Sequence, residues 1–180
     1  MFTIFGKKKI KEETASNIFI NNLLDTIEKG FPEIAGIIND SPEFVACPNI
    51  SENNSEKFLL IIIAANLQFI PEQFNNCQDD RMLDLIYSQL AKVFGVEKER
   101  LEGLIKDYQN YIAKVNLPSK NTVYGISKAI FGKYELNQFQ DEYFKNMKSP
   151  NPMFLKRLDD AIDCFIWNWT GFKDKYQVTQ

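Results

Sequence analysis

Two groups of aspartates are the residues whose type and spacing are best suited to chemistry. The first group is Asp79, Asp80 and Asp84, and the second is Asp159, Asp160 and Asp163. Carboxylates one helical turn apart lie on the same face, and two such faces opposite each other can hold magnesium ions that bind a diphosphate. The pattern therefore raises one hypothesis, a magnesium-dependent enzyme acting on a diphosphate. A second interpretation is structural, because carboxylates at a helix start also stabilise its N-terminus.

Both aspartate stretches resemble the aspartate-rich motifs of helical isoprenoid diphosphate synthases. The resemblance covers two short patches of the 180 residues. It implies a pair of facing helices with magnesium held between them and a diphosphate as the substrate.

Several classes of catalytic and cofactor chemistry are excluded by what the sequence lacks, whereas carboxylate, lysine, tyrosine and thiol chemistry stay open. The chain contains no histidine, which rules out Ser-His-Asp and Cys-His nucleophiles, His-ligated zinc and a His pH switch. Gly125 and Gly132 are separated by six residues where a P-loop has four, and no G-x-G-x-x-G motif or EF-hand loop is present. We therefore expect no catalytic residues and no cofactor.

The three cysteines also carry no metal or disulfide pattern. Cys47, Cys77 and Cys164 lie far apart, and no C-x-x-C spacing occurs. Reduced thiols in a cytosol fit this distribution best.

The last predicted helix carries the residues that we assign to a partner. Asn151 as N-cap and Pro152 at the first position predict a helix that runs to about Trp169. On such a helix Asp159, Asp163 and Trp167 form an i, i+4, i+8 stripe beside the apolar face. A tryptophan beside carboxylates is typical of a contact hot spot, so we predict a partner-binding surface at these three residues. Trp167 should be more exposed than Trp169, which continues the apolar face.

A basic stretch rich in aromatic residues, 114–148, raises a third hypothesis. Ser119 to Phe131, followed by a glycine-containing turn and a second short helix, could form a helix-turn-helix that binds DNA. The stretch contains no arginine, the residue that DNA-reading surfaces usually present, and the whole chain has a net charge of −3. Nucleic acid is therefore not the partner that we expect.

The N-terminus combines an apolar tip with a basic run. Phe2, Ile4 and Phe5 precede four lysines, Lys7, Lys8, Lys9 and Lys11. Such a segment could contact a membrane surface or a groove on a partner, or pack on its own domain.

The elements that position these residues are helical by their apolar spacing. The pattern predicts helices over about 13–29, 55–69, 79–94, 97–115, 119–132 and 151–169, with a short one near 136–147. Gly30 and Pro32 should end the first helix. Residues 31–54 have turn signals and room for a short helix or a short extended segment.

Residues 58–70 should form the centre of the fold, because Phe58 to Ala65 are apolar all round. We predict an all-α fold, a compact irregular bundle of six to seven helices around this segment. The side chains expected to be buried together are Leu60, Ile61, Ile63, Leu83, Ile86, Leu90, Leu104, Ile105, Tyr108, Leu158, Ile162 and Phe165.

Composition bounds the remaining expectations. With 180 residues and 44% apolar content, the chain should form one helical domain, 1–180, with flexible ends over about 1–12 and 172–180. The longest apolar run is too short to span a bilayer, and no secretion signal is apparent, so we expect a cytoplasmic protein. The function that we favour is a non-enzymatic protein-interaction or regulatory module, acting on a protein partner or by self-association.

Overall fold

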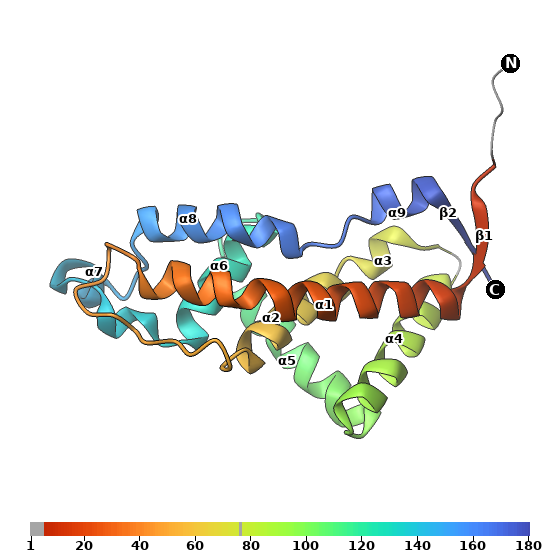
Figure 1. Cartoon of the computed structure of the whole chain (residues 1–180), viewed down its shortest axis with the longest axis horizontal. Coiled ribbons are helices and arrows are strands. Elements are labelled where there is room, and N and C mark those ends of the chain that lie inside the picture. The colour runs from red at the N-terminus through yellow and green to blue at the C-terminus, as the bar shows by residue number, and fades with distance from the viewer. Residues whose placement is uncertain (1–5, 76) are drawn as a thin grey trace, which may run out of the picture.

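The longest helix, α1 (Glu12–Asn39), extends along most of the length of the molecule, and the other helices pack against it or against its neighbours (Figure 1). The computed structural model describes residues 6–75 and 77–180. In chain order its elements are β1 (Lys8–Lys11), α1, α2 (Glu56–Leu67), α3 (Ile70–Gln73), α4 (Gln78–Phe94), α5 (Lys98–Asn116), α6 (Thr122–Lys133), the 3-10 helix η1 (Leu136–Phe139), α7 (Glu142–Met147), α8 (Pro152–Ile162), the 3-10 helix η2 (Asp163–Phe165), α9 (Trp169–Lys175) and β2 (Tyr176–Thr179).

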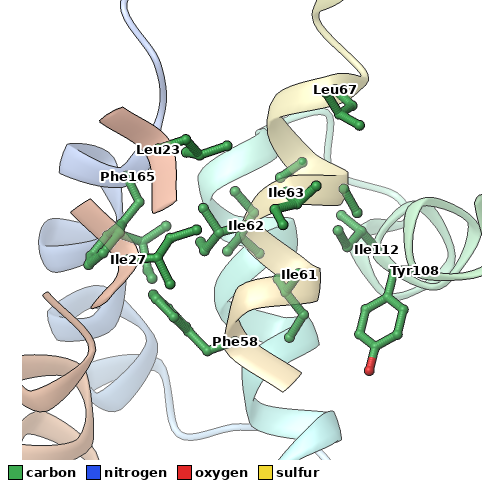
Figure 2. Close-up of a cluster of buried hydrophobic side chains, with 14 of the residues drawn as sticks. Leu23, Ile27, Phe58, Ile61, Ile62, Ile63, Leu67, Tyr108, Ile112 and Phe165 are labelled. Atoms are coloured by element: carbon green, nitrogen blue, oxygen red, sulfur yellow. The ribbon is translucent and has the colours of Figure 1, made fainter. Parts of the chain in front are cut away.

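The apolar helix α2 lies at the centre of the core, as its sequence predicts. Every residue from Ile61 to Leu67 is buried, because α1, α5 and α6 all pack against this helix. Figure 2 shows Leu23 and Ile27 of α1 on one side of it and Tyr108 and Ile112 of α5 on the other. The prediction of a helical bundle around this segment is confirmed, with seven helices of seven or more residues in the described part of the chain.

The predicted core is correct for most of its members and wrong for one. Nine of the twelve side chains are buried, and Leu60 and Leu83 are half-buried. Leu104 is 40% exposed although it belongs to the apolar stripe of α5. The prediction fails there because none of the described elements covers that side of the first turns of α5.

The prediction that Gly30 and Pro32 end the first helix is wrong, because α1 continues to Asn39 with Pro32 inside it. A proline inside a helix costs about 3 kcal/mol. Burial on both sides of it offsets this cost, since Phe31, Ile34 and Ile38 continue the face that Ile27 begins. Gly30 is also needed where it stands, because a Cβ there would collide with the ring of Phe165.

Residues 8–11 and 176–179, which lie within the segments that the sequence predicts to be flexible, about 1–12 and 172–180, pair with each other. β1 and β2 form a two-stranded parallel sheet in which Lys8 lies opposite Tyr176 and Ile10 opposite Val178. This pairing joins residues about 168 positions apart, so no local pattern could reveal it. The fold is therefore mostly helical with one small sheet rather than wholly helical.

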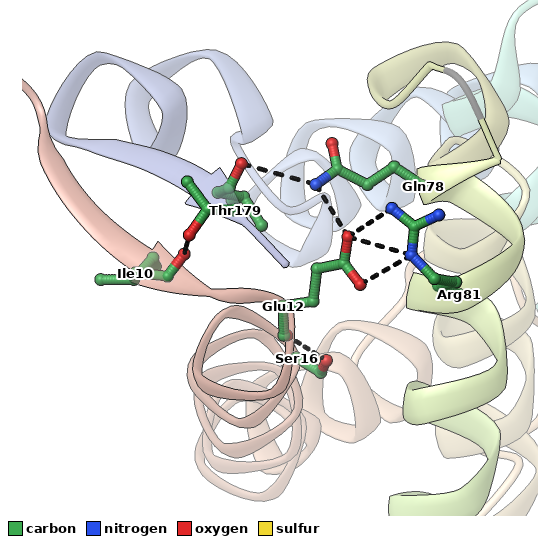
Figure 3. A network of polar contacts seen from close by, with 7 residues as sticks. Ile10, Glu12, Ser16, Gln78, Arg81 and Thr179 are labelled. Atoms are coloured by element: carbon green, nitrogen blue, oxygen red, sulfur yellow. Dashed lines mark hydrogen bonds and ion pairs between the residues drawn. The ribbon is translucent and has the colours of Figure 1, made fainter.

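An ion pair between a buried acid and a partly exposed arginine links the start of α1, next to this sheet, to α4 (Figure 3). Glu12, 6% exposed, accepts hydrogen bonds from Arg81 Nε and Nη2, the latter at 2.8 Å, and from Gln78 Nε2 at 3.0 Å. Gln78 Nε2 also donates to the Val178 carbonyl of β2. The hydrogen bonds from Arg81 hold the pKa of Glu12 below its usual value, although burial acts in the opposite direction.

Among the described residues, no helix combines the length and the hydropathy that crossing a bilayer requires.

Candidate interaction surface

The stripe predicted from Asp159, Asp163 and Trp167 does not form on one helix. α8 ends at Ile162, Asp163 begins the 3-10 turn η2, and Trp167 lies in the extended linker before α9. The prediction of one helix from Asn151 to Trp169 is therefore wrong beyond residue 162. Its start is right, because Asn151 Oδ1 accepts a hydrogen bond from the backbone N–H of Met153.

A buried asparagine in the central helix explains the break. Asn66, 1% exposed, donates from Nδ2 to the Phe165 carbonyl at 2.9 Å and accepts at Oδ1 from the Trp167 N–H at 2.8 Å. These bonds satisfy backbone groups that a continuing helix would have paired internally. Asn168 then caps α9, because its Oδ1 accepts from the Gly171 N–H.

The break turns Trp167 and Trp169 into parts of one aromatic cluster beside α1. Trp169 is 4% exposed and stacks on Phe19, while Trp167 is half-buried and meets Phe19 and Phe172 at ring distances of 5.7 and 5.9 Å. The prediction that Trp167 is the more exposed of the two is confirmed. A partner-binding role for Asp159, Asp163 and Trp167 stays a prediction, and Trp167 lies over core aromatics rather than on an open flank.

Asp159 points toward α6 rather than away from the bundle. Its Oδ1 and the Oγ of the fully buried Ser127 both lack a hydrogen bond within the described residues. Burial raises the pKa of Asp159 above its usual value, the nearby Ser127 hydroxyl lowers it, and the charge of Asp160 raises it further. Asp163, by contrast, is exposed.

The two aspartate groups are not assembled into a metal site. Asp79 and Asp80 lie in the first turn of α4, while Asp159 and Asp160 lie near the end of α8, and these two helices are well separated in Figure 1. Within residues 6–75 and 77–180, no three acids or cysteines approach one another as ligands of one ion. The geometry thus gives the diphosphate hypothesis no support.

The basic stretch 114–148 forms one good helix and a broken one. α6 is packed against α2, α5 and α8, so most of its surface is covered. The second helix of the expected helix-turn-helix is divided into η1 and the six-residue α7. This division leaves no second helix long enough to lie along a DNA groove.

The apolar tip of the N-terminus, Phe2, Ile4 and Phe5, lies outside the described residues. Of the basic run, Lys8, Lys9 and Lys11 are exposed residues of β1.

A surface that the sequence analysis did not identify lies where α4 turns into α5. It is a groove of about 430 Å³ between this turn and α2, and we call it the apolar groove. Its lining residues are Leu59 and Leu60 of α2, Phe94 and Val96 at the turn, Leu101 and Leu104 of α5, and the charged residues Glu56 and Arg100.

The apolar groove is exposed because of the hairpin that carries it. Gly95 has a φ of +64°, which a glycine adopts without strain, and this sharp turn places Val96 39% exposed beside Leu104. Val93, 60% exposed, lies one turn away on the same tip. In Figure 1 α4 and α5 form a V whose tip points away from α1, so this hairpin protrudes from the rest of the molecule.

The charges at the apolar groove are one acid and one base from different helices. Glu56 begins α2 and Arg100 lies in the first turn of α5, and both are exposed. The other two arginines of the chain pair with acids, Arg81 with Glu12 and Arg157 with Glu43. Arg100 makes no such pair within the described residues.

Comparison of the chain with protein-family models, with curated proteins and with solved structures finds no significant match.

Proposed function

We propose that this chain is a non-enzymatic protein-interaction module that binds through the apolar groove. The observation that carries the proposal is Leu104, which lies in the apolar stripe of α5 and is 40% exposed. Some apolar side chains belong to the apolar stripe of a helix and yet stay exposed to water in the fold. Such side chains are typical of surfaces that a partner covers. Leu60 and Val96 extend the same uncovered area across to α2.

The partner that we propose is a second copy of this chain. In a two-fold interface the same patch meets itself, so a contact from one residue to a second is repeated in reverse by the other copy. A groove bordered by one acid and one base is self-complementary under this operation, because Glu56 of one copy can meet Arg100 of the other. An interface core of leucine, valine and phenylalanine with charges at its edge also has the usual composition of a dimer contact.

The proposal is tested by sedimentation equilibrium of the full chain over micromolar to hundreds of micromolar concentration. We expect the weight-average mass to rise with concentration from 20.9 kDa toward twice that value. Leu104→Glu should keep the chain monomeric, because the new carboxylate would be buried without a partner in the interface.

Ala113→Glu is the matched control, since Ala113 is exposed on the same helix and does not line the groove. This variant should associate like the unmodified chain, and circular dichroism should show both variants folded. A chain that stays monomeric over the whole range, or a Leu104→Glu variant that associates unchanged, would overturn the proposal.

A further inference from the structure

We propose that a second cavity, between α5, α6 and the segment joining α7 to α8, binds a small aromatic anion. This cavity has a volume of about 480 Å³, within the range of about 300–1,000 Å³ that small-molecule sites occupy. It lies near the C-terminal half of α5, whereas the apolar groove lies at the N-terminal half. The proposal is therefore independent of the proposed function.

The walls of the cavity suit a flat apolar body. Val115 and Tyr111 of α5, Phe131 of α6 and Pro150 of the segment before α8 line it. Phe131 is buried and Tyr111 half-buried, so the ring edges are held in place by the core. Aromatic walls of this kind favour an aromatic guest through edge and face contacts.

The charges of the cavity are all of one sign. Lys128 and Lys148 line it, and its lining residues include no acid. Neither lysine forms an ion pair within the described part of the chain. The ammonium of Lys128 lies 4.5 Å from the centre of the Tyr124 ring on the same helix, and Lys148 is exposed. Two lysines without an acid partner give the cavity a positive potential that attracts an anion, and Ser149 adds a side-chain hydroxyl to its lining.

The backbone at Lys148 supports a role for its side chain. Lys148 has a φ of +51° at the end of α7, the left-handed conformation that glycine adopts most readily. A lysine is strained in this backbone conformation, and Lys148 is one of the residues that line the cavity.

A glycine keeps the opposite wall in place. A Cβ at Gly132 of α6 would collide with the hydroxyl of Tyr111, so the absence of a side chain is what lets this tyrosine reach across α6. Lys133, one residue on, places its ammonium 4.6 Å from the centre of the Tyr111 ring and adds to the positive potential beside the cavity.

The test is isothermal titration of the full chain with phenyl phosphate, benzoate, inorganic phosphate and benzyl alcohol. We expect an aromatic anion, phenyl phosphate or benzoate, to bind at least about tenfold more tightly than inorganic phosphate or benzyl alcohol. Only the aromatic anions can contact the aromatic walls and the lysines at the same time. A preference between the two anions identifies the head group as phosphate or carboxylate. Lys128→Met and Lys148→Met should each weaken this binding by about tenfold.

Lys156→Met is the matched control, since Lys156 is an exposed lysine of α8 that does not line the cavity. It should bind like the unmodified chain. Absence of binding by both aromatic anions, or equal binding by the unmodified chain and both cavity variants, would overturn the proposal. Binding of inorganic phosphate as strong as that of phenyl phosphate would do so too. The Leu104→Glu variant should retain the site, so a failure here is separate from a failure of self-association.

Discussion

Asn66 shows how one buried polar residue decides the course of a distant segment. It lies in the most apolar helix of the chain and hydrogen-bonds to backbone groups of residues 165 and 167. A buried amide must find partners, so its presence in this helix predicts that some backbone segment leaves regular structure beside it. The sequence indicates the need for a partner, whereas the identity of that partner depends on the tertiary fold.

Asn66→Ala should lower the free energy of unfolding by about 1–3 kcal/mol for each backbone group left without its bond. The Phe165 carbonyl and the Trp167 N–H would both be affected. Urea denaturation measures the change. Asn22→Ala removes an exposed amide with only a local bond on α1, and should stay within about 0.5 kcal/mol of the unmodified chain.

Asp159 should make the fold less stable as the pH rises. Its pKa is raised in the folded chain, so the native state binds more protons than the unfolded state between the ordinary value of 3.8 and the folded value. Stability falls across that interval and stays lower above it. Asp159→Asn should therefore melt at a higher temperature than the unmodified chain at pH 7, and the advantage should vanish by about pH 3. An advantage that persists undiminished at low pH would contradict this cause.

Among the elements, the helices with clear boundary residues were the predictable ones. α4 and α5 match their expected ranges within about a residue or two, because Gly95 separates two strongly periodic patterns. The sequence predicts too short an α1, because the local proline signal carries no information about the burial that outweighs it. The pairing of β1 with β2 was missed because a strand of four residues has little pattern of its own.

The link between α1, α4 and the sheet should respond to pH in the opposite direction to Asp159. The lowered pKa of Glu12 means that its pairing stabilises the fold above the ordinary value of 4.5 and ceases to do so as the pH falls through the folded value. Arg81→Met should lower the melting temperature at pH 7, and the difference should narrow in acid. Differential scanning calorimetry from pH 7 down into acid measures both the lower melting temperature of the variant and its convergence with that of the unmodified chain.

Lys29→Met is the matched control for that measurement. It removes the basic partner of Asp25, an ion pair in which both side chains are more than half exposed. Exposed pairs contribute little, so this variant should melt close to the unmodified chain at every pH. Equal effects of the two substitutions would mean that burial of Glu12 is not what makes its pair matter.

At the scale of the whole molecule, the arrangement around α2 followed from composition and periodicity, whereas the candidate surfaces did not. The prediction at Trp167 depends on one unbroken helix from residue 151 to 169. Because α8 ends at Ile162, Asp159, Asp163 and Trp167 do not form a stripe on one helix. The apolar groove could have been suspected only from Val93 and Val96 around Gly95, since Leu104 looks like any core residue until its neighbours are known. Exposure is a property of the assembled fold and is not contained in one helix.

In the self-association that we propose, two copies meet through the apolar groove with Glu56 of each copy against Arg100 of the other. The most direct measurement is the dimer dissociation constant, by sedimentation, of Glu56→Arg, Arg100→Glu and the variant that carries both changes. Each single change places like charges together and should weaken association by at least about fivefold, corresponding to about 1 kcal/mol. The double change re-creates the opposite-charge pair with its partners exchanged and should restore association close to the original. Single changes that leave the dissociation constant unaltered would contradict this arrangement. So would a double variant whose association is weakened as much as the two single losses added together.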